Sequence, residues 1–453
     1  MKIIILGCGK AGHTVIASLT GEGHDIVAID KSPDEVEDVT TTFDVMGLCG
    51  NGMDSDIMKE AGVSEAELFV AVTDSDEMNM LSCYIARKLG AKHTVARIRN
   101  PEYNDDSLVF LKHNLNISLA LNPDMFVAHE ISNILRFPSA VKVETFSGRK
   151  LEIVEIIMKE DSPFTGMKLS ELRKKHNEKF LICYVMRDEE VYIPKGDFEL
   201  KIGDRVGFTA SHNEILKLLR NMGMPQKDPE SVMIIGAGRS AYYLAKRLTA
   251  IGVTVKIVEK DYEHCVEISN LIPEAVVING DGMQYDVLRE EGINSTDAFI
   301  TLTGTDEENI LSALFAHEQG VPTVIAKVNR SELAQTAEKL GLECIVSPQN
   351  TVSDIISRYV RALKNSVGCN METLYKLMDG KSEVSEFKVR EDFVYVNIPI
   401  SQLRLKANIL VAGIVRGKKP IVPTGSDVIL PEDRVIVISA GQRINDLVDI
   451  INC

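Results

Sequence analysis

The sequence contains no tryptophan, and aromatic residues as a whole make up only 6% of its 453 residues. No apolar run approaches the roughly 18 residues that a transmembrane helix requires, so we expect no transmembrane segment. The chain starts directly on an apolar, strand-like run without the charged region of a signal peptide. These absences favour a cytoplasmic protein.

The eight cysteines lack any organising pattern. They lie at positions 8, 49, 83, 183, 265, 344, 369 and 453, with no Cys-x-x-Cys pair and no histidine cluster beside them. This spacing argues against a metal site and against a disulfide framework. It is typical of reduced, mostly buried thiols in a cytoplasmic protein.

Positive charge is in short supply. The chain has 50 lysine and arginine residues against 66 aspartate and glutamate residues, which gives a formal net charge of −16. Nucleic-acid binding usually needs a basic face, so we expect no nucleic-acid partner, and a DNA-binding redox sensor is disfavoured. The nine histidines are scattered, and no serine-centred nucleophile motif or pair of catalytic carboxylates is recognisable.

What the sequence does contain is a strand, glycine turn, helix and second strand at its start. The apolar run from Ile3 ends in Gly7, Gly9 and Gly12, and the second apolar run ends at Asp30. Glycines at this spacing allow a tight turn, close approach of the backbone to a pyrophosphate, and close packing of helix on strand. The helix N-terminus offers free N–H groups to phosphates. A carboxylate at position 30 favours ribose hydroxyls and repels a 2′-phosphate, so NAD(H) or a plain adenine nucleotide is expected rather than NADP.

Strand and helix patterns continue to alternate after this unit. Further strands are expected near residues 43–48, 68–72, 94–98 and 117–120. The alternation predicts an α/β fold with a doubly wound parallel sheet, a Rossmann-like lobe. A helix predicted over Asp124–Leu135 ends before Pro138, and short β-rich runs within residues 140–220 then predict a small α+β lobe.

The whole pattern occurs twice. Gly236 and Glu259 match Gly7 and Asp30 at an offset of 229 residues, and the small-lobe residues repeat as well. The small-lobe matches are Pro194, Gly196, Asp204 and Arg205 with Pro423, Gly425, Asp433 and Arg434. A tandem order of this kind is far more specific evidence than one glycine motif.

The duplication predicts two nucleotide-binding lobes, each followed by a connecting helix and a small lobe. In the first half we expect the nucleotide lobe at 1–123, the helix at 124–138 and the small lobe at 139–222. A linker at 223–231 follows. In the second half we expect the nucleotide lobe at 232–348, the helix at 349–368 and the small lobe at 369–453. The connecting helices are expected to transmit structural changes between lobes.

Candidate ligand-binding residues lie where the predicted strands end, because a doubly wound sheet binds its ligands at that edge. In the first lobe they are Gly7, Cys8, Gly9, Lys10, Ala11, Gly12, Asp30, Lys31, Asn51, Gly52, Thr73, Asp74, Asn79, Arg97 and Arg99. In the second lobe they are Gly236, Ala237, Gly238, Arg239, Ser240, Ala241, Glu259, Lys260, Asp281, Gly282, Thr303, Gly304, Asn309 and Lys327. We predict no catalytic and no metal-binding residue.

Several of these candidates also fit a purely structural role. Asn51 and Asp281, each between two glycines, fit either a contact to a base edge or a tight turn. The cationic side chains that end the fifth strand of each lobe, Arg97 with Arg99 and Lys327, fit either phosphate binding or surface salt bridges.

The acidic loops at the end of the fourth strand are equally open to two interpretations. Thr305 with Glu308 has the spacing of a capping box, and Asp74 with Glu77 has it more loosely. Capping explains the acidic residues but not why asparagine recurs at positions 79 and 309. A ligand site and a helix cap are therefore favoured about equally.

The duplicated motifs resemble those of the Trk-type potassium uptake regulatory proteins, the peripheral NAD-binding subunits of bacterial Trk systems. The resemblance spans essentially the whole chain and rests on the order and spacing of short motifs. These are GCGKAG with Asp30, GNG at 50–52, AVTDSDEMN at 71–79, ARIRNPEY at 96–103 and the second copies GAGRSA, GDG, TLTGTDEEN and AKVNR.

The resemblance implies tandem regulator-of-potassium-conductance units and a homotetrameric ring on the inner face of the cell membrane. The ring would lie beneath a potassium-translocating membrane subunit, and NAD(H), ATP or ADP would shift its shape. Arg239 and Ala241 make the second glycine loop unlike the first, so equal ligand preference of the two sites is not implied. The alternative function is a soluble NAD-dependent oxidoreductase with a duplicated cofactor lobe.

Overall fold

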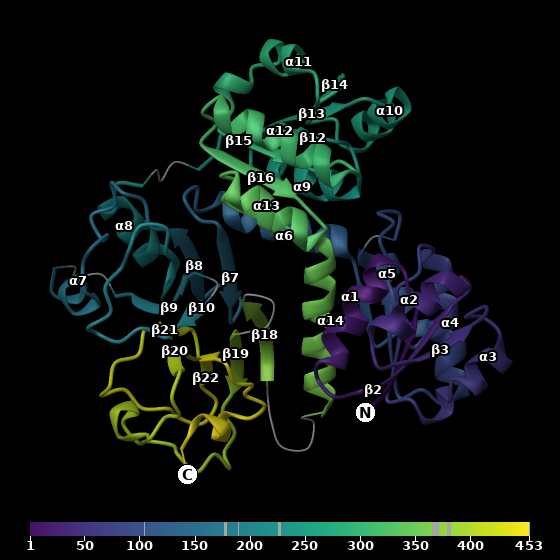
Figure 1. The fold of residues 1–453 in the computed structure, drawn as a ribbon, viewed down its shortest axis with the longest axis horizontal. Coiled ribbons are helices and arrows are strands. Elements are labelled where there is room, and N and C mark those ends of the chain that lie inside the picture. Colours follow the sequence, from purple (N-terminus) through teal and green to yellow (C-terminus); the bar gives the residue numbers. More distant parts are fainter. Residues whose placement is uncertain are drawn as a thin grey trace.

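The computed structural model describes residues 1–103, 105–175, 179–188, 190–224, 228–364, 371–377 and 382–452. Pro225 of the predicted linker, residues 365–368 of the second predicted connecting helix, and Cys369 and Cys453 lie outside this part of the chain. Within it, two large α/β lobes and two small lobes follow one another in the order large, small, large, small (Figure 1).

The first large lobe is a six-stranded parallel sheet in the order β3-β2-β1-β4-β5-β6. Its strands are β1 (Lys2–Leu6), β2 (Asp25–Asp30), β3 (Met46–Cys49), β4 (Leu68–Ala71), β5 (His93–Arg97) and β6 (Leu119–Leu121). Its helices are α1 (Lys10–Thr20), α2 (Pro33–Thr42), α3 (Ser55–Glu60), α4 (Asp76–Leu89) and α5 (Asp105–Asn114). The order in which successive strands are added to the sheet reverses between β1 and β4, and this switch point is where such sheets bind ligands.

The second large lobe repeats the same order, β14-β13-β12-β15-β16-β17, with all pairs parallel. Its strands are β12 (Ser231–Ile235), β13 (Thr254–Glu259), β14 (Val276–Asn279), β15 (Ala298–Thr301), β16 (Thr323–Lys327) and β17 (Cys344–Val346). Its helices are α9 (Arg239–Thr249), α10 (Tyr262–Leu271), α11 (Tyr285–Glu290), α12 (Asp306–Glu318) and α13 (Ser331–Lys339). The predicted duplicated, doubly wound parallel sheet is confirmed.

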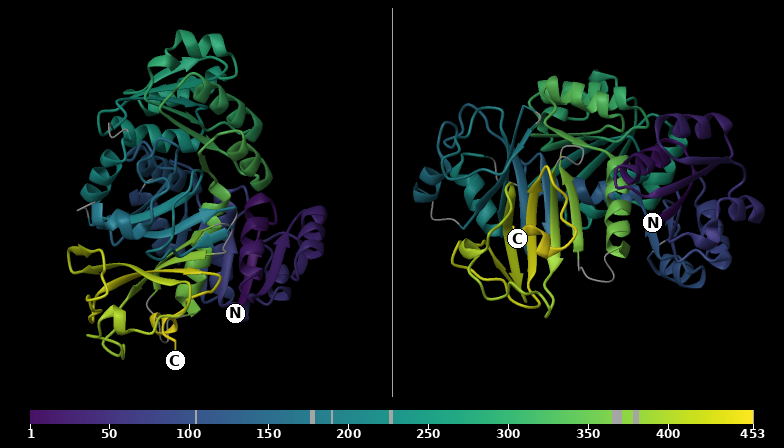
Figure 2. Two further views of the ribbon diagram at one scale, coloured as in Figure 1. Left: turned by 60° about the vertical axis from the view of Figure 1, so that its left-hand side comes forward. Right: turned by 60° about the horizontal axis from the view of Figure 1, so that its bottom comes forward.

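Each small lobe is a five-stranded antiparallel sheet. The strand order is β10-β9-β11-β8-β7 in the first lobe and, read from the matching edge, β21-β20-β22-β19-β18 in the second, so the two orders correspond. The first contains β7 (Lys142–Phe146), β8 (Leu151–Ile157), β9 (Leu181–Arg187), β10 (Glu190–Tyr192), β11 (Arg205–Ala210), α7 (Leu169–Lys175) and α8 (His212–Asn221). The second contains β18 (Met371–Leu377), β19 (Ser382–Lys388), β20 (Ile409–Arg416), β21 (Lys419–Ile421) and β22 (Arg434–Ala440). Figure 2 shows the two small lobes side by side, and Phe146 and Tyr184 share a core with Val384 and Ile438.

The aspartate that recurs in the small lobes holds a loop. Asp204 and Asp433 are buried, and each receives two hydrogen bonds from one guanidinium, Arg187 at 2.6 Å and Arg416 at 2.8–2.9 Å. Each also accepts a backbone N–H three residues earlier in the chain. The recurrence of this aspartate is thus explained by its role in folding the loop.

Element boundaries differ slightly from the sequence pattern, for local reasons. Ser32 caps α2 and Pro33 is its first residue. The apolar run begins at Phe43, but strand β3 begins later. The N–H of Phe43 ends α2 by bonding the Val39 carbonyl, and the Phe43 ring packs on His13. The strand therefore begins at Met46.

The two long connecting helices are exchanged between the halves. Helix α6 (Pro123–Leu135) leaves the first large lobe and packs on α9 of the second, with Val127 and Ile131 in the same core as Leu244 and Leu248. Helix α14 (Pro348–Lys364) leaves the second large lobe and packs on α1 of the first (Figure 1). Each large lobe thus completes its core with a helix from the other half.

A buried ion-pair network fixes the contact between α14 and the first large lobe. The Arg361 guanidinium bonds both carboxylate oxygens of Glu383 at 2.8 Å and both of Glu22 at 2.8–3.0 Å. Burial alone would raise the pKa of Glu22, but the neighbouring His24 imidazole and the hydrogen bonds and charge of Arg361 outweigh it and lower that pKa to about 2. Three parts of the chain, α1, α14 and β19, therefore depend on one arginine.

No helix within the described ranges is long and apolar enough to cross a lipid bilayer.

Replacing Arg361 by methionine should destabilise the protein by about 3–5 kcal/mol, because two buried carboxylates lose the guanidinium between them. Urea unfolding followed by circular dichroism measures this loss. Glu22 stabilises the native state above its unfolded pKa, and this contribution fades as pH falls towards 2. Without Arg361 the pKa of Glu22 rises, so the loss should be larger at pH 7 than at pH 4.

The matched control is Arg434→Met, because Arg434 pairs with Glu372 at 2.6 Å on the surface. Exposed pairs contribute up to about 1 kcal/mol. If Arg361→Met were no more damaging than this control, the network would not hold the halves together.

Candidate functional site

The two glycine loops lie at the carboxyl ends of β1 and β12, as the sequence predicts. Gly7 and Gly236 have φ angles of +103° and +94°, which side chains rarely adopt. A Cβ at Gly12 would lie 1.8 Å from the carbonyl oxygen of Gly7, so only glycine lets α1 start this close to the turn. In the second loop, Ala241 is fully buried at the matching position.

Both helices that follow these loops begin with an open N-terminus. Gly9 and Gly238 are the N-cap residues of α1 and α9, no side chain caps either helix, and neither first turn contains an acidic residue. A Cβ at Gly9 would have no heavy atom within 4 Å, and one at Gly238 would have only the Leu302 carbonyl oxygen, at 4.0 Å. Each helix end thus lacks a cap of its own and has room beside its N-cap residue, which is the geometry of a phosphate site.

Asp30 and Glu259 hold the glycine loops in place. The Asp30 carboxylate accepts the Cys8 N–H at 2.7 Å and the Ser32 N–H at 2.9 Å. Glu259 makes the same two bonds, to Ala237 at 2.8 Å and Asp261 at 2.9 Å. A carboxylate has about four acceptor positions, so two remain for ribose hydroxyls. Their role as ribose ligands stays a prediction.

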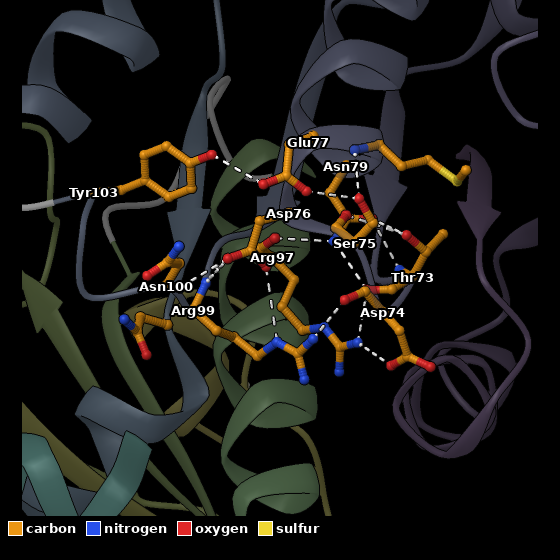
Figure 3. A network of polar contacts seen from close by, with 12 residues as sticks. Thr73, Asp74, Ser75, Asp76, Glu77, Asn79, Arg97, Arg99, Asn100 and Tyr103 are labelled. Atoms are coloured by element: carbon orange, nitrogen blue, oxygen red, sulfur yellow. Dashed lines mark hydrogen bonds and ion pairs between the residues drawn. The ribbon is translucent and has the colours of Figure 1, made fainter. Parts of the chain in front are cut away.

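The asparagines that recur at 79 and 309 are part of the scaffold. Asn79 is fully buried, and its amide bonds the N–H, hydroxyl and carbonyl of Thr73 and the carbonyl of Arg97, at 2.7–3.0 Å (Figure 3). Asn309 is also fully buried and joins Thr303 to the Lys327 carbonyl. Each side chain therefore ties the end of the fourth strand to the end of the fifth. These bonds account for both asparagines, and a ligand contact of either one stays a prediction.

The capping predictions for the acidic loops are wrong in detail. The N-cap of α4 is Ser75, whose hydroxyl accepts the Met78 N–H at 3.1 Å, and Asp74 takes no part. Thr305 is the N-cap of α12, but its side chain makes no capping bond.

Two acidic residues that the sequence analysis did not select have a structural role next to these caps. The buried Asp76 accepts the backbone N–H groups of Arg99 and Asn100 at 2.7–2.8 Å (Figure 3). Asp306 does the same for Asn329 and Arg330. These acids hold the loop that follows the fifth strand.

The cationic residues of the first crevice are held by the same loop. Arg97 is buried and bonds the Thr73 carbonyl at 2.6 Å and the Asp74 carboxylate at 2.9 Å, and Arg99 bonds the Asp74 carbonyl (Figure 3). Burial and then the charge of Arg99 lower the pKa of Arg97, while Asp74 opposes them. The Nε donor of Arg97 is buried and has no hydrogen-bond partner among the described residues. A buried guanidinium with an unused donor fits an anionic ligand.

The glycine-bounded segments after the third strand form turns. Asn51 and Asp281 each accept a backbone N–H two residues later, at 3.0 and 2.9 Å. A Cβ at Gly52 would lie 2.2 Å from Leu6, and one at Gly282 would lie 2.3 Å from Ile235. Turn formation and close packing on β1 and β12 therefore account for these residues, and a base contact is left as a prediction.

The remaining candidates are either exposed at the edge of a crevice or buried as packing residues. Lys10, Lys31, Arg239, Lys260 and Gly304 are exposed, whereas Cys8 is buried. Burial raises the pKa of Cys8 to about 12, so this thiol stays protonated and acts as a small side chain. Among the described residues no group of three or more histidine, cysteine, aspartate and glutamate residues could hold a metal ion.

One residue that the sequence analysis did not select reaches a crevice from the other half. Asp124, in the first turn of α6, accepts a hydrogen bond from the Ser240 hydroxyl of the second glycine loop at 2.6 Å. Nothing in its sequence neighbourhood indicates this, because the contact joins residues 116 positions apart.

Comparison with known families identifies all four lobes. Residues 3–114 and 232–348 match the TrkA-N domain, and residues 153–223 and 384–452 match the TrkA-C domain. The chain is 31% identical over 450 residues to the Trk system potassium uptake protein TrkA homolog of Archaeoglobus fulgidus, which covers 99% of this chain and 100% of that protein. It is 29% identical over 451 residues to the Trk system potassium uptake protein TrkA of Vibrio alginolyticus, covering 98% and 96%.

A solved structure, the GsuK channel bound to NAD, has the same fold over 97% of this chain and 76% of its own, with a TM-score of 0.63 at 17% identity. The order of lobes, the paired glycine loops and the full-length similarity all agree. The chain belongs to the TrkA family of Trk system potassium uptake proteins.

Proposed function

We propose that this chain is a nucleotide-sensing regulatory subunit that gates a potassium-translocating membrane subunit. Its two crevices bind NAD(H), with ATP and ADP as further ligands, and the bound nucleotide changes the relative positions of the lobes. In this proposal the chain works as a homotetramer on the inner face of the cell membrane.

The observation that carries this proposal is the duplicated open helix N-terminus. Gly9 and Gly238 leave the N-termini of α1 and α9 without a side-chain cap, and a carboxylate suited to ribose hydroxyls lies beside each loop. A pyrophosphate would accept the free N–H groups there, and the ribose would meet Asp30 or Glu259. The related GsuK channel, whose structure is described as bound to NAD, supports this choice of ligand.

Binding without catalysis fits the polar groups of the first crevice. Its acidic loop, residues 73–79, and the segment 97–103 contain no histidine. Asp76 is fixed by backbone N–H groups, and burial with the Glu77 contact raises the pKa of Tyr103, which makes that phenol a poor acid. His13 and Asp38 lie 3.7 Å apart between α1 and α2, too far for the hydrogen bond that a general base needs. A regulatory role is therefore preferred over an oxidoreductase.

The exchanged helices give the nucleotide a route to act on the assembly. A ligand shifts an equilibrium only through its different affinities for two states. A nucleotide at the first crevice contacts α1, which packs on α14 of the other half. A nucleotide at the second crevice contacts α9, which packs on α6. A preference of about 1.4 kcal/mol per crevice changes the population ratio about tenfold, and several crevices multiply that effect.

Gly9→Asp and Gly238→Asp should each close one crevice. The φ angles of −63° and −68° suit any residue, and a Cβ has space. Aspartate is a favourable N-cap, so its carboxylate would occupy the phosphate position without harming the helix. We expect NAD and ADP binding to weaken at least roughly tenfold at the altered crevice, measured by isothermal titration calorimetry, with an unchanged or slightly higher melting temperature.

The matched controls are Gly9→Asn and Gly238→Asn, which cap the helix without charge and should weaken binding less. Equal nucleotide affinity in wild type and both aspartate variants would show that the glycine loops do not bind phosphate.

Potassium flux tests the regulatory role directly. In vesicles that contain the potassium-translocating subunit of the same organism, the purified chain should make flux respond to NAD, NADH, ATP or ADP. The double variant Gly9→Asp/Gly238→Asp should still bind the vesicles but leave flux insensitive to nucleotide, because ligand binding is lost while the assembly surface is kept. Steady consumption of NADH with a small carbonyl substrate, or flux unchanged by the wild-type chain, would contradict the proposal.

A further inference from the structure

The second crevice contains a carboxylate that comes from the first half of the chain. Asp124 belongs to the first turn of α6, and its Oδ1 atom accepts the Ser240 hydroxyl at 2.6 Å. Ser240 is buried and is the second residue of α9, directly after the open N-cap Gly238 and Arg239. A negative charge thus already lies at the positive end of α9, which is where a ligand phosphate would bind.

The same carboxylate also acts on the cation of the second crevice. In the first crevice, Arg97 is neutralised by Asp74 of its own loop at 2.9 Å. In the second, Lys327 takes the place of Arg97, but Gly304 takes the place of Asp74. The Lys327 ammonium bonds the Leu302 carbonyl at 3.3 Å. Burial lowers the pKa of Lys327, and the charges of Asp124 and Asp306 oppose that shift. Asp124 therefore supplies part of the negative charge that the lobe itself lacks.

The first crevice has neutral residues at the matching positions. Helices α6 and α14 both start with proline, Pro123 and Pro348, so Gln349 corresponds to Asp124. Ala11 corresponds to Ser240 at the offset of 229 residues. The two crevices share a fold but differ in charge at the helix end.

The contact is part of a link between the crevices. Asn122, the N-cap of α6, donates to the Tyr243 hydroxyl of α9 at 2.9 Å, and that hydroxyl bonds the Arg99 carbonyl of the first crevice at 3.4 Å. Movement of α9 away from α6 would therefore disturb the hydrogen bond to the segment at the end of β5 in the first lobe.

We propose that Asp124 is a specificity-determining residue of the second crevice, where its carboxylate competes with the ligand's phosphate for the N-terminus of α9. This inference rests on the proposed function. The second crevice then binds phosphate-bearing nucleotides more weakly than it would without Asp124. When such a nucleotide binds there, its phosphate displaces the Asp124 carboxylate, and the contact between α6 and α9 is lost. At the matching positions the first crevice has Gln349 and Ala11, which carry no charge.

The test uses the full chain with the first crevice closed by Gly9→Asp, so that binding reports the second crevice. Asp124→Asn keeps an oxygen that can accept the Ser240 hydroxyl and removes only the charge. We expect ADP affinity to rise roughly 2- to 5-fold, the range for one charge at a helix end, and adenosine affinity to stay unchanged because adenosine has no phosphate. Calorimetry with both ligands provides the comparison.

The reciprocal change is Gln349→Asp with the second crevice closed by Gly238→Asp, and it should weaken ADP at the first crevice by a similar factor. This variant tests the same competition even if Asp124→Asn folds poorly. ADP affinity that is unchanged or lower in the Asp124→Asn chain would overturn the inference, as would an equal gain for adenosine. Absence of any ADP binding to the wild-type chain would instead overturn the proposed function.

Discussion

The exchange of α6 and α14 between the halves is the constraint on which the rest of the structure depends. Each large lobe buries part of its core, on α1 or α9, under a helix that arrives from the other half. The buried bonds of Arg361 to Glu22 and Glu383 give one of these contacts a polar geometry that apolar packing alone would not specify. Neither half can therefore change shape at its glycine loop without affecting the helix that packs behind that loop.

In the proposed mechanism the same two helices, α1 and α9, both bind the nucleotide and contact the other half. Their N-termini are left open by Gly9 and Gly238, and their flanks carry the exchanged helices. An anion at the N-terminus of α1 or α9 acts on a helix whose side forms an interface between the two halves. The arrangement needs no catalytic group, because a difference in affinity between two lobe positions is sufficient for regulation.

Much of this could be predicted from the sequence, because the signals are local. Glycine spacing, strand runs that end at Asp30 or Glu259, and the repeat at a constant offset fix the fold and both crevices. The features that could not be predicted from the sequence depend on contacts between elements. The scaffold bonds of Asn79 and Asn309 could not be predicted, because only the folded sheet shows that their amides join two strand ends. Asp124 could not be found at all, since the exchange that brings it to Ser240 has no sequence signature.

Hydrogen–deuterium exchange of the full chain with the second crevice closed by Gly238→Asp tests the central claim most directly. Saturating NAD then binds only at the first glycine loop. The account predicts altered exchange in α1 and also in α14, which belongs to the other half and packs on α1. Exchange that changes around β1 and α1 alone, with α14 unaffected, would contradict the claim that the exchanged helices carry the signal.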